Sequence, residues 1–254
     1  MKIIKGLKWC ATWLSLTVLK RALHYRINAD GGYWLQPVAA NTPLLFNRID
    51  FIFDHCRGKN VLHIGFTDHP YTRQRIKDGL LLHNQLRPFV KGLTGMDVED
   101  AAVQQYITLT KDKNVFKGDI MIGFPPQVLA CKPALILLPE VLEHLTNPYK
   151  AIEVLHTNFA AGTMVLVTVP NYTALDCWAA SLNNTESIHP NHHWYFSPYT
   201  LRRLFDEKRF KMEQLHFGMY NQTGYPVNPV LKKFPFNGDC ILALFTIIKD
   251  GQHD

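Results

Sequence analysis

The chain has few cysteines, and their spacing excludes the usual roles of clustered thiols. Its 254 residues include five cysteines, an odd number, and no two of them form a Cys-x-x-Cys pair. This pattern indicates neither a disulfide framework nor a cysteine zinc site. We therefore expect a reducing, cytoplasmic compartment.

The chain also lacks compositional bias and internal repeats. Glycine and proline number 15 each, which excludes a collagen-like or low-complexity protein. Hydrophobic residues make up 47% and charged residues 19%, so the chain has enough apolar side chains for a core. A net charge of +6 favours anionic partners without choosing among phosphorylated substrates, nucleic acid and acidic membrane surfaces.

Long apolar runs are absent as well. The longest uncharged run near the start, residues 9–19, is shorter than the ~20 residues that span a bilayer. Lys20 and Arg21 follow it without a small-residue cleavage site, which argues against a signal peptide. Apolar residues recur at helical spacing over residues 1–20, and we expect a helix packed on the domain. The alternative is a basic helix that lies on a membrane surface, which would make the protein membrane-peripheral.

From about residue 60 onward, short apolar runs alternate with helix-compatible stretches. This alternation predicts an α/β fold, a doubly wound parallel sheet with helices on both faces. We expect an N-terminal helical extension over residues 1–59, one ligand-binding domain over residues 60–254, and a long loop over residues 219–239 that contributes to a lid. The expected strands are 61–65, 93–98, 114–120, 134–138, 164–169, 211–218 and 240–249, and the expected helices are 72–86, 100–109, 148–159 and 198–206.

Several short segments at or near the expected strands follow one another in a specific order along the chain. They are NVLHIG, GMDVED, KGDI, the long block PALILLPEVLEHLTNPYKAIEVLHTNFAAGTMVLVTVPN, and HHWYFSPYTLRRLF. Over residues 58–218 this order resembles the class I S-adenosylmethionine-dependent methyltransferases. It looks closest to the branch of ubiquinone-type O-methyltransferases and glycan-tailoring methyltransferases. The resemblance implies S-adenosylmethionine as cofactor and a Rossmann-like, seven-stranded, mostly parallel sheet whose last strand is antiparallel.

Four positions are candidate cofactor contacts. Gly65, after the first strand, permits close approach of the backbone to a ligand. Asp97, at the end of the second strand, can accept both ribose hydroxyls, although a solvated turn residue is the alternative. The resemblance implies that Asp119 accepts from the adenine amino group, although Gly-Asp is also common in turns. Leu138, at the end of the fourth strand, should face both donor and acceptor.

The glycine loop departs from the family pattern. The family usually has an acid followed by Gly-x-Gly-x-Gly, whereas here His63 occupies the acid's position and only Gly65 of the three glycines remains. The family acid helps to bind the methionine amino group. We assign His63 to the cofactor site, with Asp68 as a replacement carboxylate. The altered loop also motivates an alternative function, an inactive methyltransferase-fold protein that serves as a binding scaffold.

The candidate catalytic residues lie on the acceptor side. Methyl transfer from a sulfonium is a direct displacement, so the protein mainly aligns the reactants, and an oxygen nucleophile also profits from a base. The candidates are His192, His193 and Glu140, with histidines packed in an aromatic-rich loop as the alternative. We expect O-methylation of a small-molecule or glycan-like acceptor.

A metal site is the remaining alternative. Glu140, Glu143 and His144 are spaced i, i+3 and i+4 and, with His189 or His192, form a set that can hold a divalent ion. Small-RNA 2′-O-methyltransferases of the superfamily have a similar E-x-x-E-H cluster, which motivates a metal-assisted RNA 2′-O-methyltransferase as a third function. The same motif occurs in metal-free relatives, and the basic residues are dispersed rather than clustered in a stripe. We therefore expect no metal ligands and no nucleic-acid partner.

Overall fold

The computed structural model describes residues 44–45, 47–220, 231 and 234–249. The expected helix over residues 1–20, with its alternative membrane contact, and most of the expected loop over 219–239 lie outside the described residues. The described elements, in chain order, are β1 Leu44–Leu45, α2 Arg48–Cys56, β2 Asn60–Ile64, α3 Thr72–Lys77, α4 Leu82–Leu86, β3 Gly92–Asp97, α5 Asp100–Thr110, β4 Val115–Lys117, α6 Pro126–Ala130, β5 Leu135–Pro139, η1 Leu142–His144, α7 Pro148–Asn158, β6 Met164–Pro170, α8 Leu175–Ser181, α9 Pro198–Leu204, β7 Phe210–Gly218, η2 Pro235–Asn237 and β8 Cys240–Ile247.

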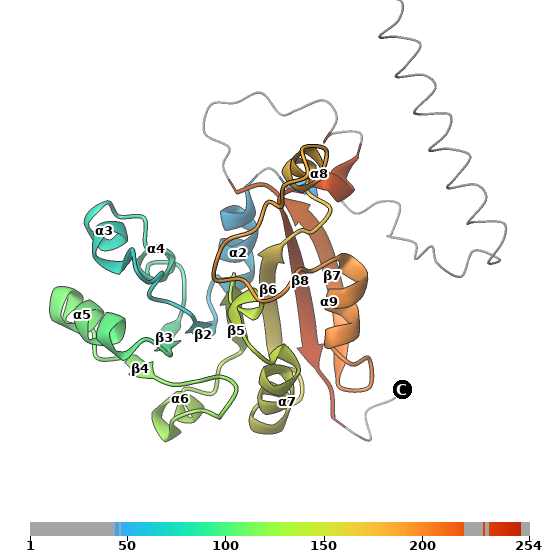
Figure 1. The fold of residues 1–254 in the computed structure, drawn as a ribbon. Helices are drawn as coiled ribbons and strands as arrows, with labels where there is room; N and C mark the ends of the chain where they lie inside the picture. The colour runs from blue at the N-terminus through green and yellow to red at the C-terminus, as the bar shows by residue number, and fades with distance from the viewer. Residues whose placement is uncertain (1–43, 46, 221–230, 232–233, 250–254) are drawn as a thin grey trace, which may run out of the picture. The chain divides into compact units, whose positions relative to one another are not determined.

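The strands form one sheet in the order β1-β7-β8-β6-β5-β2-β3-β4 (Figure 1). The seven strands expected from the apolar runs are β2 to β8. All of their pairings are parallel except those of β8, which runs antiparallel to both β6 and β7. The prediction of a doubly wound, seven-stranded, mostly parallel sheet is therefore confirmed. The two-residue β1 was not predicted, and it pairs parallel to the end of β7.

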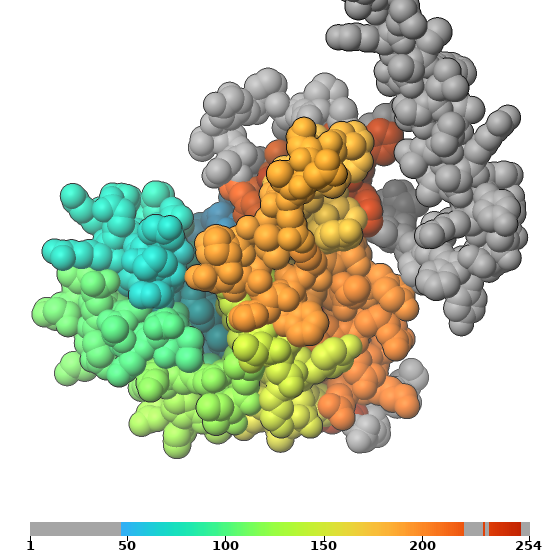
Figure 2. Space-filling view, viewed as in Figure 1, coloured from blue at the N-terminus to red at the C-terminus, as the bar shows by residue number. Residues whose placement is uncertain are grey.

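The strand order reverses between β2 and β5. β2 pairs with β3 on one side and with β5 on the other. The chain therefore adds β3 and β4 on one side of β2 and then returns to add β5 and β6 on the other side. In open α/β sheets ligands bind at such a point, beyond the carboxyl ends of the strands. Figure 2 shows the surface hollowed between the teal-to-green region of α3 to α5 and the orange segment that precedes α9.

The core lies on both faces of the sheet. On one face Ile52 and Cys56 of α2 pack against Leu135 and Leu137 of β5. Successive strand residues point to opposite faces, so Leu138 belongs to the other face, and like Leu137 it is fully buried. The division of the chain at residue 59 stays a prediction, because most of residues 1–59 lies outside the described part.

The expected helix over residues 72–86 was wrong as a single element. It consists of α3 and α4, separated by a turn in which Gly79 has a φ of +69°. A left-handed residue ends a helix, and glycine adopts that conformation at little cost. The short helices α6 and α8 were not predicted. Among the described residues, no helix combines the length and apolarity needed to cross a membrane.

Candidate active site

The loop after β2 begins at Gly65 and touches the loop after β5. Gly65 has a φ of +73°, and a Cβ at this position would lie 2.7 Å from Cγ2 of Val141. Its N–H donates to the Met96 carbonyl at 2.9 Å, which joins the loop to β3. Only glycine fits this turn without strain. The contact with Val141 places the β2 loop beside the segment that carries Glu140, Glu143 and His144.

Asp97, the acid that ends β3, is buried and already holds three donors. Its Oδ2 accepts from the Thr67 backbone N–H at 3.0 Å and from the Thr67 hydroxyl at 2.7 Å. Its Oδ1 accepts from the Glu99 N–H at 3.1 Å. A carboxylate has about four lone-pair sites, so about one remains for a ribose hydroxyl. Sequence reasoning missed this role of Thr67, which stands at the second glycine position of the family loop.

Asp119 lies beside Asp97 because β3 and β4 are parallel neighbours. The register pairs Asp97 with Lys117, and the Gly118 N–H donates to the Asp97 carbonyl at 2.9 Å. One oxygen of the Asp119 carboxylate accepts from the Met121 N–H at 2.8 Å, which fixes its own loop. The structure therefore brings these two acids to neighbouring strand ends, as the sequence predicts.

The other two expected cofactor contacts make different interactions. Asp68 is exposed, and its Oδ2 forms an ion pair with Nε of Arg75 on α3 at 2.9 Å. Leu138 pairs with Val167 in the sheet, and its side chain lies in the core. Its backbone, at the end of β5, is the part that lies near the crevice. The roles assigned to Asp68 and Leu138 stay predictions.

His63 faces a second buried histidine, His83 of α4. Their Nδ1 atoms lie 3.3 Å apart, and their rings stack with centroids 5.4 Å apart. Burial lowers the pKa of His63 to about 3 and places the pKa of His83 well below its usual value, with the charges of His63 and Arg87 adding to the effect on His83. Both imidazoles are neutral at pH 7. His63 therefore does not supply the negative charge of the acid that the family usually has here.

The adenosyl part of S-adenosylmethionine fits this arrangement. The strand reversal opens the crevice, and Asp97 and Asp119 at adjoining strand ends are acceptors for a ribose hydroxyl and an amino group. The methionine side differs from the family pattern, because His63 points into the core and Asp68 pairs with Arg75. The cofactor contacts named from the sequence stay predictions.

On the acceptor side, a network of three donors holds Glu140. Its Oε1 accepts from Arg48 Nη1 at 3.2 Å and from the Thr168 hydroxyl at 2.7 Å, and its Oε2 accepts from the Tyr220 hydroxyl at 2.5 Å. The Arg48 guanidinium also lies 4.9 Å from the centroid of the Tyr220 ring. Sequence reasoning missed these three donors, because they come from α2, β6 and the end of β7 and share no local motif with Glu140.

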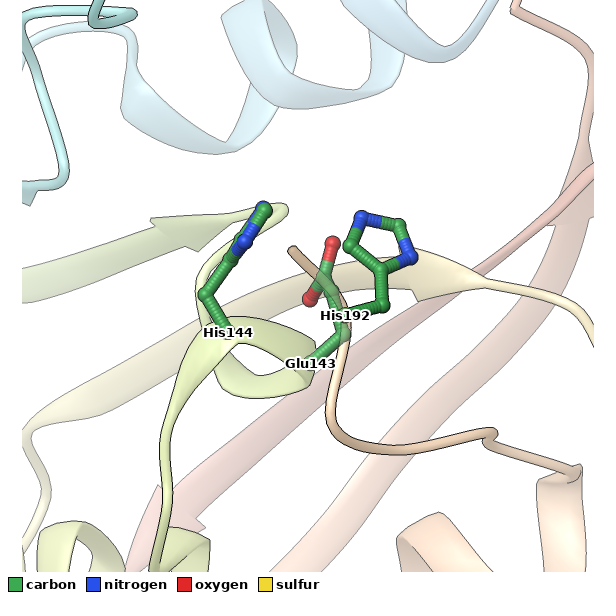
Figure 3. A group of neighbouring side chains, drawn as sticks. All are labelled: Glu143, His144 and His192. Atoms are coloured by element: carbon green, nitrogen blue, oxygen red, sulfur yellow. The ribbon is translucent and has the colours of Figure 1, made fainter. Parts of the chain in front are cut away.

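Three further side chains gather beside this network: Glu143 and His144 of η1, and His192 of the segment before α9 (Figure 3). Each offers one ligand atom, and these atoms lie within 4.8 Å of one another. Glu143 is fully buried, and neither carboxylate oxygen has a hydrogen-bond partner in the described part of the chain. The His193 N–H donates to the Glu143 carbonyl at 2.7 Å, which ties the two segments together. The His193 imidazole itself is exposed.

The surroundings of the cluster set the charge of its members. Burial, with the charges of His144 and His189, lowers the pKa of His192 to about 4, and burial also lowers the pKa of His144. Burial and the nearby Glu140 carboxyl raise the pKa of Glu143 well above its usual value. At pH 7 both imidazoles are therefore neutral and keep a lone pair. A histidine with so low a pKa is a weak general base at neutral pH.

Aromatic side chains lie on the segments that follow β6 and precede α9. The Trp194 indole N–H donates to the Leu145 carbonyl at 2.7 Å, which holds the ring beside the η1 segment. The rings of Tyr172 and Tyr195 meet edge to face with centroids 5.3 Å apart. Tyr172 and Trp194 remain 56% and 41% exposed, so both have apolar ring surface open to solvent.

Comparisons with known proteins agree with the fold. The profile of a family described as a methyltransferase domain matches residues 44–215. The chain resembles the N-methyltransferase NodS of Bradyrhizobium japonicum WM9 in complex with S-adenosyl-L-homocysteine, with a TM-score of 0.50 and 17% identity over 80% of this chain and 85% of that chain. A S-adenosylmethionine-dependent methyltransferase from Aquifex aeolicus gives a TM-score of 0.51 and 13% identity over 80% and 91% of the two chains. The small RNA methyltransferase HEN1 gives a TM-score of 0.55 and 15% identity over 80% of this chain and 25% of that chain. A comparison with curated proteins gives no match.

At such identities the structural likeness concerns the fold. The family match, by contrast, covers more than half of the chain, from β1 into β7. It agrees with the sheet order and with the acids at the ends of β3 and β4. The chain therefore belongs to the methyltransferase-domain family and is a S-adenosylmethionine-dependent methyltransferase of the class I fold.

Proposed function

We propose that the chain methylates an oxygen atom of a small or glycan-like acceptor, which binds beside Glu140, His144 and His192. S-Adenosylmethionine supplies an already activated methyl group, so the protein has to align the acceptor and manage its proton. The hydrogen bonds to Glu140 fix the position of its side chain, since donors from α2, β6 and the end of β7 converge on one carboxylate.

The observation that carries the proposal is the pair of neutral imidazoles next to the cofactor loop. Val141 touches Gly65 of that loop, and His144 follows Val141 by less than one helical turn. A hydroxyl loses its proton during transfer, and His144 and His192 offer lone pairs that can accept a hydrogen bond from that hydroxyl and orient it. The exposed His193 stays the candidate general base on the solvent side.

The acceptor class is inferred from the aromatic surroundings. A sugar presents C–H faces that stack on exposed rings and hydroxyl edges that hydrogen-bond to polar groups. Tyr172, Trp178 and Trp194 supply such rings on the segment after β6. A nucleic-acid acceptor would require a stripe of basic residues that tracks phosphates, whereas the basic residues of this chain are dispersed along the sequence.

Methyl transfer from labelled S-adenosylmethionine tests the proposal. The acceptor panel comprises nucleotide sugars, lipid-linked glycans, quinone precursors, amines and RNA, and mass spectrometry locates the added methyl group. We expect the label on an oxygen of a sugar or small hydroxyl compound. Preferred labelling of an amine, or of RNA with a steep dependence on salt, would contradict the proposal. Cofactor binding without transfer to any acceptor would favour the scaffold interpretation.

Substitutions distinguish catalysis from folding. His192→Gln and His193→Gln should lower kcat in at least one case while the affinity for S-adenosylhomocysteine stays unchanged. His216→Gln serves as the matched control, because His216 lies on β7 and contacts Gln214 and Phe51 rather than the cluster. Equal activity of all three variants and the parent would remove the histidines from the reaction.

A further inference from the structure

We propose that Glu143, His144 and His192 bind a divalent first-row transition-metal ion. The ion site goes beyond the proposed function. Its ligands come from two segments, η1 and the segment before α9, and His144 and His192 are 48 positions apart in the sequence. The backbone hydrogen bond between His193 and Glu143 joins the two segments. The three side chains point toward one another from these two segments (Figure 3).

Glu143 provides the first argument. Glu143 is a fully buried carboxyl group without a hydrogen-bond partner in the described part of the chain, and such a group destabilises the fold. Buried charges in proteins are normally paired or coordinate a metal. Arg48 forms its ion pair with Glu140 and not with Glu143. A cation between the Glu143 carboxylate and the two imidazoles would provide the partner that the described residues do not.

The histidines provide the second argument. Nδ1 of His144 lies 3.2 Å from the Asn191 carbonyl, which only accepts hydrogen bonds, so Nδ1 carries the proton and Nε2 keeps its lone pair. Donation of one ring N–H to a backbone carbonyl is the usual support of a metal-binding histidine. The His192 ring meets the His144 ring edge to face, with centroids 4.6 Å apart.

Two neighbouring side chains with ligand atoms, Glu140 and His189, are engaged elsewhere. The Glu140 carboxylate is held by Arg48, Thr168 and Tyr220. Nδ1 of His189 accepts from the Asn191 N–H at 3.3 Å, so the lone pair of that nitrogen is already engaged. The inferred set is therefore two nitrogens and one oxygen, which leaves positions on the ion for water or an acceptor hydroxyl.

The donor set indicates the class of ion. Imidazole nitrogens with one carboxylate suit Zn²⁺, Co²⁺, Mn²⁺ and Fe²⁺, whereas Mg²⁺ and Ca²⁺ prefer oxygen ligands. An ion at this place would draw an acceptor hydroxyl to one of its open positions. That role rests on the proposed function, whereas ion binding does not and is measured without any acceptor.

The experiment uses the full chain after treatment with a chelator. Calorimetry with Zn²⁺ and Mg²⁺, and visible absorption with Co²⁺, report affinity and ligand geometry. We expect one Zn²⁺ per chain at this site, binding much tighter than Mg²⁺, and Co²⁺ bands typical of mixed nitrogen and oxygen ligands. Glu143→Gln and His192→Gln should each weaken this binding by about 100-fold or more.

His189→Gln and His216→Gln are the matched controls and should bind Zn²⁺ as the parent does. The affinity for S-adenosylhomocysteine, measured for every variant, verifies that the fold persists. Unchanged Zn²⁺ binding in both Glu143→Gln and His192→Gln, equal loss in His189→Gln, or Mg²⁺ binding as tight as Zn²⁺ would each overturn the assignment. Full methyl transfer by the chelated protein would leave the proposed function standing and remove the ion's role in it.

Discussion

The Thr67 hydroxyl donates a 2.7 Å hydrogen bond to the carboxylate of Asp97, and the Thr67 backbone N–H donates to the same oxygen. Through these two bonds the loop after β2 is anchored to the end of β3. The family loop has a glycine at this position, and a glycine has no side chain with which to form the first bond. The two hydrogen bonds from Thr67 to Asp97 thus hold this loop in one conformation, although it has only one of the three glycines of the family loop.

The first prediction concerns this anchor. Thr67→Val keeps the shape of the side chain but removes the hydroxyl donor to a buried carboxylate, so the free energy of unfolding should fall by about 1.5–3 kcal/mol. Thr67→Ser keeps the donor and should lose less. Urea denaturation measures both variants. Equal stability of Thr67→Val and the parent would show that the hydroxyl bond is absent in solution.

The second prediction concerns the cofactor. Asp97→Asn removes the charge that accepts a ribose hydroxyl, and hydrogen bonds to charged groups contribute about 1.5–3 kcal/mol, so the affinity for S-adenosylhomocysteine should fall by about 10- to 100-fold. Isothermal titration calorimetry measures the change. Asp54→Asn, an exposed position on α2, is the matched control and should bind as the parent does. Binding unchanged in Asp97→Asn would remove this acid from the cofactor site.

The sequence predicted the parts of the site that depend on single strands. Apolar runs located β2 to β8, and the carboxyl ends of β3 and β4 located Asp97 and Asp119, because parallel strands end at one edge of a sheet. Glu143 and His144 were recognised by helical spacing, although the sequence favoured the absence of metal ligands.

Contacts between distant segments were not predictable in the same way. Arg48 meets Glu140 across 92 positions and Tyr220 meets it across 80, and no local pattern records either pairing. The orientation of His63 toward His83 depends on how α4 packs on the sheet, which in turn depends on the break at Gly79. The spacing of residues along the sequence does not show which of these side chains lie close together, because such contacts arise from tertiary packing.

The third prediction concerns pH. The pKa of His63 falls from 6.5 to about 3 on burial, so the unfolded chain binds more protons than the folded chain between these values. The stabilisation is complete above pH 6.5 and is lost as the pH decreases toward 3. Between pH 6.5 and pH 5 the loss from this one group should be about 1.5 kcal/mol. His83, whose pKa also lies well below its usual value, adds to the loss in the same direction.

Urea denaturation at several pH values, compared between the parent and His63→Asn, isolates this contribution. The difference in unfolding free energy between the two proteins should shrink as the pH decreases through this window. His69→Asn is the matched control, because that histidine is exposed in the folded chain. Parallel pH dependences of the parent and His63→Asn would mean that the imidazole is accessible to solvent in the folded protein.

The fourth prediction concerns the network around Glu140. Arg48→Met leaves a carboxylate that is only 23% exposed without its cation, and should lower the free energy of unfolding by about 1.5–3 kcal/mol. Adding Glu140→Gln to this variant should recover part of the loss, which gives a coupling of about 0.5–3 kcal/mol in a double-mutant cycle. The exposed pair Lys150 and Glu153 is the control, and its coupling should be too small to measure. Strict additivity at Arg48 and Glu140 would contradict the ion pair.

The fifth prediction concerns Glu143 in the metal-free protein. Glu143→Met replaces a buried, unpartnered carboxyl with an apolar side chain of similar length, so the variant should be more stable than the chelated parent by about 1–3 kcal/mol. Added Zn²⁺ should reverse the order, because a ligand at 100 times its dissociation constant stabilises the folded state that binds it by about 2.7 kcal/mol. Thermal unfolding with and without Zn²⁺ measures both effects. If the metal-free Glu143→Met protein is less stable than the parent, the carboxyl has a partner within the protein. If Zn²⁺ does not change the stability of the parent, the carboxyl does not bind this ion. Thermal unfolding with and without Zn²⁺ thus distinguishes a carboxylate that binds a cation from a carboxylate that stabilises the fold through protein contacts.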